Sequence, residues 1–324
     1  MRINKTDLPV YASLFSVVFL WGTSFAVSKI GLQDLSPLNL AGIRFSIASL
    51  IFGAILLAQK TGRTVERQDI FPLVVMGFMA ITSYFYIQYT GLLYTTSINA
   101  SLLLATSPVW TTLAGMATRQ ERVTAKTFGG ILLAFVGISL VISRGKMFSL
   151  FASATIGGDM LLLLNAVVWA GFTLYGKKIM QKYPPFTAIA YINIFGTVML
   201  LPVILIPSRL NPVSLVGQLA GISLSTVLSA VYLAVLCSVY GYYMWYKGIA
   251  RIGAVRTASF YYISPLFAFL AGTWLLDETV TALVVLGGLM VIAGVYLTNK
   301  YKIVLETGEP NGKAGTESRG GSKR

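Results

Sequence analysis

Residues 107–125, SPVWTTLAGMATRQERVTA, are repeated as residues 264–282, SPLFAFLAGTWLLDETVTA. In both stretches a Ser-Pro pair comes first and a glutamate lies 13 residues after the proline, and the two copies are 157 residues apart. Without gaps, the similarity extends to residues 140 and 297 and includes 13 identities in 34 positions. Because self-similarity at a fixed spacing is typical of a duplicated architecture, we expect the chain to consist of two homologous halves.

The duplication continues towards the N-terminus, where the spacing between matching residues is 148, as in Trp21/Trp169, Lys29/Lys177 and Pro37/Pro185. The second half is therefore longer after Pro185, and the polar stretch 207–221 is the natural place for the additional residues. We predict a first repeat at residues 8–143 and a second at residues 157–298. Residues 300–324 are too polar to pack into a core, so we expect a disordered cytoplasmic tail.

The composition is that of a protein whose solvent is lipid. Hydrophobic residues make up 56% of the chain and charged residues 11%, with a mean hydropathy of +0.74, whereas charged residues are about a quarter of a soluble domain. Apolar segments of about 20 residues, the length of a bilayer-spanning helix, recur along the chain. The short alternating segments of a β-barrel are not seen. We predict an all-α membrane protein with ten transmembrane helices, at residues 10–30, 37–58, 71–90, 97–117, 126–143, 158–176, 186–206, 222–246, 254–276 and 280–298.

Lys and Arg are distributed unevenly over the two ends of these helices. Counted at alternate ends, one side of the membrane holds 20 of the 25 residues, the other side holds 4, and Arg44 lies inside a segment. Positive residues are enriched in cytoplasmic loops, which predicts a multi-pass protein of the cell inner or plasma membrane with both termini in the cytoplasm. The formal net charge of +14 is thus a signal of topology, and no nucleic-acid partner is expected.

The two halves are expected to be inverted relative to each other. Each contains five helices, and an odd number makes the second half enter the membrane from the opposite side. The charges agree, because Arg119, Arg122 and Lys126 accompany the first hairpin whereas its copy carries Asp277 and Glu278. Inverted repeats are the architecture of secondary transporters, in which two similar halves expose one central site to each side in turn.

Several classes of site are excluded by composition. The chain has one cysteine, Cys237, and no histidine, which excludes a disulfide framework, histidine catalysis and metal sites built from these ligands. No phosphate-binding loop is present, so nucleotide hydrolysis does not drive transport. We expect no enzyme activity, no cofactor and no metal. A membrane-embedded enzyme or receptor would need a polar cluster or a sizeable extramembrane domain that the short loops do not provide.

Four motifs resemble the EamA-type branch of the drug/metabolite transporter superfamily, and the resemblance covers nearly all of residues 8–300. They are Trp21-Gly22-Thr23-Ser24-Phe25, Arg44-Phe45, the doubled Pro-to-Glu hairpin, and Gly158-Asp159 followed by Trp169-Ala170. The resemblance implies an exporter with a central cavity lined mainly by helices 1, 3, 4, 6, 8 and 9, with helices 5 and 10 packed peripherally. Members of this family handle amino acids, other metabolites and drugs, so it does not name a substrate.

Aromatic and amide side chains are the best candidates for binding a substrate, because amphipathic groups suit a cavity for amphipathic or aromatic molecules. Tyr84 and Gln88, four residues apart, share one helical face. The alternative is that many of these aromatic residues form the belts found at membrane interfaces. The predicted cavity residues are Trp21, Thr23, Tyr84, Gln88, Asn99, Trp169, Tyr240, Tyr243 and Tyr261.

Two prolines are candidates for hinges or gates. Pro108 and Pro265 are expected in the middle of helices, where a proline removes a backbone hydrogen bond and kinks or opens the helix. The alternative is a packing kink whose freed backbone groups are satisfied by neighbouring helices. Because the break occurs at equivalent positions of both halves, we favour a gating or cavity-shaping role.

Three charged residues need a role in or near the membrane. Glu121 and Glu278 fall at helix boundaries, where we expect each to cap the helix that follows, because a helix N-terminus favours negative charge. A proton-carrying role is the alternative. Arg44 lies well inside a helix, so it must be paired, extended to the interface or functional. It could attract a substrate carboxylate, although helix 2 is not among the cavity walls that the resemblance implies.

Glycines spaced by seven residues, Gly130 with Gly137 and Gly287 with Gly294, put small residues on one face of helices 5 and 10 and predict close helix packing. The sequence leaves open whether this packing lies within a monomer or across a homodimer.

Together these features predict a secondary transporter, in the exporting direction, of small metabolites such as amino acids or aromatic compounds. The expected partners are the lipid bilayer and a small-molecule substrate. Two alternatives stay open: a passive channel for small solutes, and a multidrug-type exporter of amphipathic cations.

Overall fold

The computed structural model describes residues 8–59, 64–118, 121–122, 124–143, 155–252, 257, 260–301 and 303–304. The first half contains α1 (Leu8–Gly31), α2 (Pro37–Ala58), α3 (Arg67–Gly77), η2 (Phe78–Ser83), α4 (Tyr84–Tyr94), α5 (Ser97–Leu104), α6 (Ser107–Ala117), β1 (Glu121–Arg122) and α7 (Ala125–Ser143). The second contains α8 (Ile156–Tyr175), α9 (Lys177–Lys182), α10 (Pro185–Leu205), α11 (Leu215–Leu219), α12 (Leu224–Val231), η4 (Tyr232–Tyr240), α13 (Gly241–Ile252), η5 (Tyr261–Ile263), α15 (Ser264–Leu276), α16 (Ala282–Tyr301) and β2 (Ile303–Val304).

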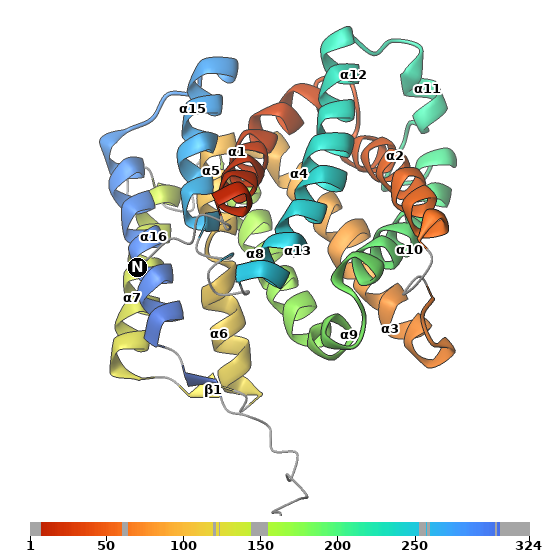
Figure 1. The fold of residues 1–324 in the computed structure, drawn as a ribbon. Helices are drawn as coiled ribbons and strands as arrows, with labels where there is room; N and C mark the ends of the chain where they lie inside the picture. Colours follow the sequence, from red (N-terminus) through yellow and green to blue (C-terminus); the bar gives the residue numbers. More distant parts are fainter. Residues whose placement is uncertain are drawn as a thin grey trace, which may run out of the picture.

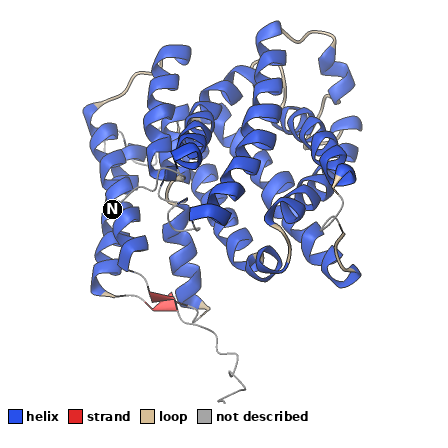
Figure 2. Cartoon of the chain, viewed as in Figure 1, coloured by secondary structure: helices blue, strands red, loops and turns tan. Residues whose placement is uncertain are grey.

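The described residues form an almost entirely helical bundle, as predicted (Figure 1). Within them, nine helices are long and apolar enough to cross a membrane, and a tenth apolar helix, Tyr261–Leu276, is shorter. The exception to the all-α prediction is a ribbon of two short strands, in which Glu121 of β1 pairs with Val304 of β2 (Figure 2). Most of the predicted tail, and the predicted connection around residues 144–154, lie outside the described residues.

Helices α7 and α16, the fifth helices of the two repeats, pack against each other at one edge of the bundle (Figure 1). A Cβ atom on Gly130 would lie 2.8 Å from the carbonyl oxygen of Gly294, and one on Gly137 would lie 2.6 Å from that of Gly287. The beginning of α7 therefore meets the end of α16, so the two equivalent helices are antiparallel. Equivalent helices that cross a membrane in opposite directions confirm the predicted inversion.

The same contacts answer the question of where the glycines pack. The repeat relates Gly130 to Gly287 and Gly137 to Gly294. When each residue is replaced by its equivalent, the contact between Gly130 and Gly294 becomes the contact between Gly287 and Gly137. This exchange is the mark of a two-fold axis between α7 and α16. The glycine faces are used within one chain, where they allow the two backbones to approach closely.

The two halves are interleaved rather than placed side by side. Helix α1 packs against α12, α13 and α15 of the second half, α2 packs against α10, and α4 packs against α8. The elements of both repeats therefore share one core.

Four spans are irregular, and the irregularities recur at equivalent positions. The third and eighth spans contain π-helices, η2 and η4, and residues 78–83 map onto residues 235–240 of η4 at the repeat spacing. The fourth span is broken at Ala105 and Thr106 between α5 and α6, and in the ninth the 3-10 turn η5 directly precedes α15. Single turns of π-helix inside α-helices are frequent at functional sites.

The two prolines were expected in the middle of helices. They lie instead directly after these breaks. Pro108 is the second residue of α6 and Pro265 is the second residue of α15. At the start of a helix the missing N–H has no partner to lose and the fixed φ suits the helix. Each proline therefore begins a half-helix.

Candidate functional site

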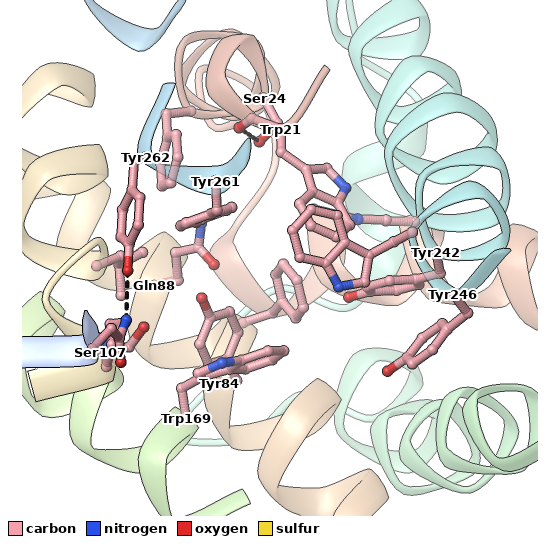
Figure 3. A pocket seen from close by; sticks show the side chains of 17 residues that line it. Trp21, Ser24, Tyr84, Gln88, Ser107, Trp169, Tyr242, Tyr246, Tyr261 and Tyr262 are labelled. Atoms are coloured by element: carbon pink, nitrogen blue, oxygen red, sulfur yellow. Dashed lines mark hydrogen bonds between the residues drawn. The ribbon is translucent and has the colours of Figure 1, made fainter. Parts of the chain in front are cut away.

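A cavity of about 230 Å³ lies in the middle of the bundle, at the interface of the two halves. Its walls are largely aromatic, and the labelled side chains converge on it from several elements (Figure 3). Trp21 of α1 and Tyr84 of α4 come from the first half, and Trp169 of α8, Trp245 of α13 and Tyr261 of η5 come from the second.

Part of the cavity lining follows the two-fold relation between the halves. Four pairs of equivalent positions both contribute to the lining, namely Trp21/Trp169, Phe85/Tyr242, Gln88/Trp245 and Leu104/Tyr261. A site that lies on the axis between two inverted halves is the place at which alternating access operates. The side chains of a pair differ in three of the four cases, so a bound molecule meets two chemically different walls.

Five of the nine predicted cavity residues line the cavity: Trp21, Tyr84, Gln88, Trp169 and Tyr261. Their rings contact one another across it. The ring centroids of Tyr84 and Trp169 are 5.2 Å apart, those of Trp21 and Trp245 are 4.9 Å apart, and those of Trp21 and Tyr261 are 6.1 Å apart. These distances are typical of favourable aromatic pairs.

The other four predicted residues lie elsewhere, with partners of their own. The Thr23 hydroxyl bonds to that of Tyr232 at 2.6 Å, and the Tyr240 hydroxyl bonds to that of Ser16 at 2.9 Å. Asn99 is buried and donates towards Asp159 at 3.4 Å. Tyr243 is 47% exposed on the outside of the bundle. Thr23, Asn99 and Tyr240 are thus occupied by contacts between helices, and Tyr243 faces away from the cavity.

Arg44 of α2 lines the cavity, although the family resemblance placed helix 2 outside its walls. The side chain is 4% exposed. Its Nε donates to the Ser238 hydroxyl at 2.9 Å, and its Nη1 donates to the Tyr89 hydroxyl at 2.9 Å. The guanidinium carbon lies 4.5 Å from the Phe85 ring centroid and 5.0 Å from that of Phe45.

The π-helix η4 determines which groups of the eighth span face Arg44 and Trp21. The Ser238 hydroxyl donates to the carbonyl of Leu233, five residues earlier, at 3.1 Å. The carbonyl of Cys237 accepts a bond of 2.9 Å from Trp21 Nε1. After this π-helix, Tyr242 and Trp245 line the cavity, whereas the predicted Tyr240 and Tyr243 do not. The repeat could have indicated Tyr242 and Trp245, because they are the equivalents of Phe85 and Gln88 in the second half.

Glu278 caps a helix, but not the one expected. Its carboxylate accepts hydrogen bonds from the backbone N–H of Ser97 at 2.7 Å, the Ser97 hydroxyl at 2.9 Å and the backbone N–H of Ile98 at 3.2 Å, and lies 3.3 Å from Lys29 Nζ. It therefore caps α5 of the other half. The helix that follows Glu278 is capped by the Thr281 hydroxyl, which accepts from the Val284 N–H at 3.3 Å.

Glu121, the equivalent residue of the first half, also does not hold the cap position of the next helix. Its backbone is part of β1, and its side chain lies outside the described residues. Thr124 precedes α7, and its hydroxyl accepts from the Thr127 N–H at 3.1 Å.

Two further carboxylates join the halves at the end of the bundle where Glu278 lies, which we name the Glu278 end. Asp34, after α1, accepts from the Ser223 N–H at 2.8 Å and from the Thr226 hydroxyl at 2.6 Å. Asp159 of α8 accepts from Thr95 at 2.5 Å and is fully buried. Neither was predicted as a site residue, because Ser223, Thr226 and Thr95 lie in the other half from the carboxylate they bind and only the fold brings them together.

The hydrogen bonds of Asp34 with Ser223 and Thr226 lower the pKa of its carboxyl to about 2. Asp34 therefore stays ionised at physiological pH and is not suited to carry a proton. Its constant negative charge is favourable at the N-terminus of α12, which it joins to the first half.

The cavity extends towards the opposite end, which carries the β1–β2 ribbon. Asn299 in the last turn of α16 lines it and donates to the Tyr262 hydroxyl at 2.5 Å (Figure 3). Helix α16 begins at the Glu278 end, so Asn299 lies near the other surface of the bundle. The described contacts join the halves at both ends, through Glu278, Asp34 and Asp159 at one and through the β1–β2 ribbon and the ion pairs of Lys182 with Glu66 and Asp69 at the other, and the cavity reaches towards the ribbon end.

Comparison with known proteins gives consistent matches over almost the whole chain. The model of the EamA-like transporter family matches residues 8–143 and 156–300. A protein of Archaeoglobus fulgidus named an uncharacterized transporter is 33% identical over 281 residues, which cover 87% of this chain and 94% of the relative. Several bacterial relatives carry names that mention a substrate, among them the following two.

The first of these, a probable amino-acid metabolite efflux pump of Salmonella typhimurium, is 29% identical over 285 residues, or 87% of this chain and 91% of its own. The second, a probable terminal-alkyne amino-acid exporter of Streptantibioticus cattleyicolor, is 28% identical over 301 residues, which cover 93% of this chain and 95% of the relative. A solved crystal structure superposes with a TM-score of 0.60 at 17% identity over 90% of this chain and 96% of its own. That likeness supports the fold alone.

Proposed function

The chain belongs to the EamA-like transporter family, and on that premise we propose that it is a secondary transporter that exports small metabolites, such as amino acids or aromatic compounds, by alternating access. The observation that carries this proposal is the aromatic cavity on the axis between two inverted halves. The names of the Salmonella and Streptantibioticus relatives support the substrate class.

Alternating access requires that the two ends close in turn, and the Glu278 contacts supply a closure at one end. Glu278 and Lys29 join the halves at one end. Their equivalents, Glu121 and Lys177, belong to the opposite end. We propose that the described conformation is closed at the Glu278 end by the bonds of Glu278 to α5, and that Glu278 releases α5 in the alternate state.

The distribution of Lys and Arg orients this cycle. It supports an orientation in which the ribbon end, with both termini, lies in the cytoplasm. The cavity would then receive its substrate from the cytoplasm and release it when the Glu278 end opens, which is the direction of an exporter.

Counterflow in proteoliposomes tests the proposal against a passive channel. A panel of amino acids and aromatic metabolites would be offered on one side of the membrane, with and without a pH gradient. We expect saturable exchange that is accelerated by unlabelled substrate on the other side. Linear flux without counterflow would contradict a carrier and favour the channel.

Shortening the aromatic walls should weaken substrate binding. Trp169→Ala and Tyr84→Ala each remove one ring of a contacting pair, so we expect KM to rise roughly five- to tenfold in each variant, because an aromatic contact contributes about 1 kcal/mol. Tyr243→Ala, which removes a ring outside the cavity, is the control and should leave KM unchanged. Equal KM values in all three folded variants would show that the cavity is not the substrate site.

The break before α15 should matter for the rate of the cycle rather than for affinity. In Pro265→Ala the new N–H can donate to the Tyr261 carbonyl, which would continue the helix through the break. We expect the maximal exchange rate to fall roughly tenfold, the order of effect of about 1.4 kcal/mol on the rate-limiting step, with little change in KM. Pro202→Ala, at a proline inside α10, is the matched control. A normal rate in Pro265→Ala would exclude the hinge role.

A further inference from the structure

The cavity is unbalanced in charge. Among its lining residues in the described part of the chain, Arg44 is the one side chain that is charged at neutral pH, and the other polar groups are neutral hydroxyl, indole and amide groups. Arginine stays protonated in proteins. A molecule in the cavity therefore lies beside a fixed positive charge, and the described walls offer it no negative one.

The partners of Arg44 do not compensate this charge. Both hydrogen bonds go to neutral hydroxyl groups, those of Ser238 and Tyr89. The ion pairs among the described residues involve Lys29 and Lys182, so no described carboxylate lies within ion-pair distance of Arg44. A buried charge without an opposite partner is costly, and such a residue inside a membrane protein indicates function more than packing.

The surroundings of the guanidinium determine where an anion can bind. Phe45 and Phe85 lie against the planar group, with centroids at 5.0 and 4.5 Å from Cζ. A guanidinium carries five N–H donors, of which the two hydroxyl acceptors take two. The remaining donors lie along its edge, where a carboxylate can accept two parallel hydrogen bonds.

We propose that Arg44 binds the carboxylate of an aromatic or otherwise apolar monoanion, and that the cavity selects its substrate by net negative charge. The inference rests on the proposed function and narrows its substrate class. The apolar body lies among Trp21, Tyr84, Trp169, Trp245 and Tyr261. Because these walls carry no carboxylate for an ammonium group, a carboxylic acid without a free amine is preferred to the corresponding amino acid, and an amine is excluded.

Ligands that share one body and differ in charge test this directly on the wild-type protein. The series is 3-phenylpropanoate, phenylalanine, 3-phenylpropanamide and 3-phenylpropylamine, and binding to the purified full chain in detergent is followed by quenching of tryptophan fluorescence and by calorimetry. We expect 3-phenylpropanoate to bind at least tenfold more tightly than phenylalanine or the amide, and the amine to show no saturable binding. Equal affinities for the acid and the amine would overturn the inference.

Variants then assign the preference to Arg44. Arg44→Gln keeps a polar donor but removes the charge, and we expect the acid and the amide to bind equally; Arg44→Lys should retain a preference for the acid. The control is Tyr243→Phe, which changes a side chain on the outside of the bundle and leaves Arg44 and its partners intact, so the preference should stay within threefold of wild type. A tenfold preference for the acid that persists in folded Arg44→Gln would also overturn the inference.

The binding series separates this inference from the proposed function. Selective binding of the acid without exchange in proteoliposomes would refute the transporter mechanism and leave the role of Arg44 intact. Exchange of amines or zwitterions with no preference for acids would support the transporter mechanism and refute the role of Arg44.

Discussion

Replacing Gly130 with valine is expected to abolish folding, whereas the same change at its neighbour Gly129 should be tolerated. A Cβ atom on Gly130 would lie 2.8 Å from both the Gly294 carbonyl oxygen and the Thr298 amide nitrogen. Both atoms belong to the backbone of α16, so they cannot rotate away as a side chain could. The two helices would have to separate along the whole contact, and a loss of more than about 4 kcal/mol is the scale of such severe packing defects.

Gly129 is a matched control because it lies in the same helix with nothing within 4 Å of its Cβ position. The measurement is the amount of monodisperse protein recovered in detergent, together with the melting temperature of each variant. We expect no folded Gly130→Val and a melting temperature of Gly129→Val within a few degrees of wild type. If the two variants behave alike, α7 and α16 do not pack through their glycine faces.

Removing the Glu278 carboxylate is expected to open the Glu278 end. The carboxylate, whose side chain is 6% exposed, satisfies two backbone N–H groups at the start of α5 and pairs with Lys29. In Glu278→Ala these groups lose their acceptor, and each unsatisfied group costs about 1–3 kcal/mol. Because the loss falls on the conformation that is closed at this end, the population of the other conformation should rise by roughly 100-fold or more.

Accessibility of a cysteine in the cavity measures this shift. Ser24 lines the cavity, so Ser24→Cys is introduced into a Cys237→Ala background and labelled with an impermeant maleimide in membrane vesicles of both orientations. Labelling from the Glu278 side should become at least tenfold faster when Glu278 is replaced by alanine. Asp277→Asn, which removes the adjacent exposed carboxylate, should leave it unchanged. An unaltered rate in Glu278→Ala would mean that this cluster does not hold the end closed.

The sequence predicted the architecture because duplication, apolar length and charge bias are all local or periodic signals. The matched pair Trp21 and Trp169 also led directly to the cavity, since equivalent positions of two inverted halves meet at their axis. Tyr84 and Gln88 followed from their shared helical face. For these residues, helical periodicity was a sufficient guide.

Periodicity failed where the helix is irregular or where a partner comes from the other half. In the eighth span, which contains the π-helix η4, the cavity face holds Tyr242 and Trp245 and not the predicted Tyr240 and Tyr243. No local pattern indicates that Glu278 reaches Ser97, 181 residues away. Arg44 was assigned to a helix outside the cavity, and its position became clear only from the packing of α2 against η4.

The exchanged contacts between α7 and α16 also bear on the ancestry of the chain. If each half is taken as a separate polypeptide, the contact of Gly130 with Gly294 and that of Gly137 with Gly287 become one contact seen from two subunits. A half-length ancestor could therefore have assembled from two copies inserted in opposite orientations, and gene fusion would have fixed that pairing. Since then, the equivalent cavity positions have come to hold different residues, Gln88 in one half and Trp245 in the other, and two copies of one gene could not have differed in this way.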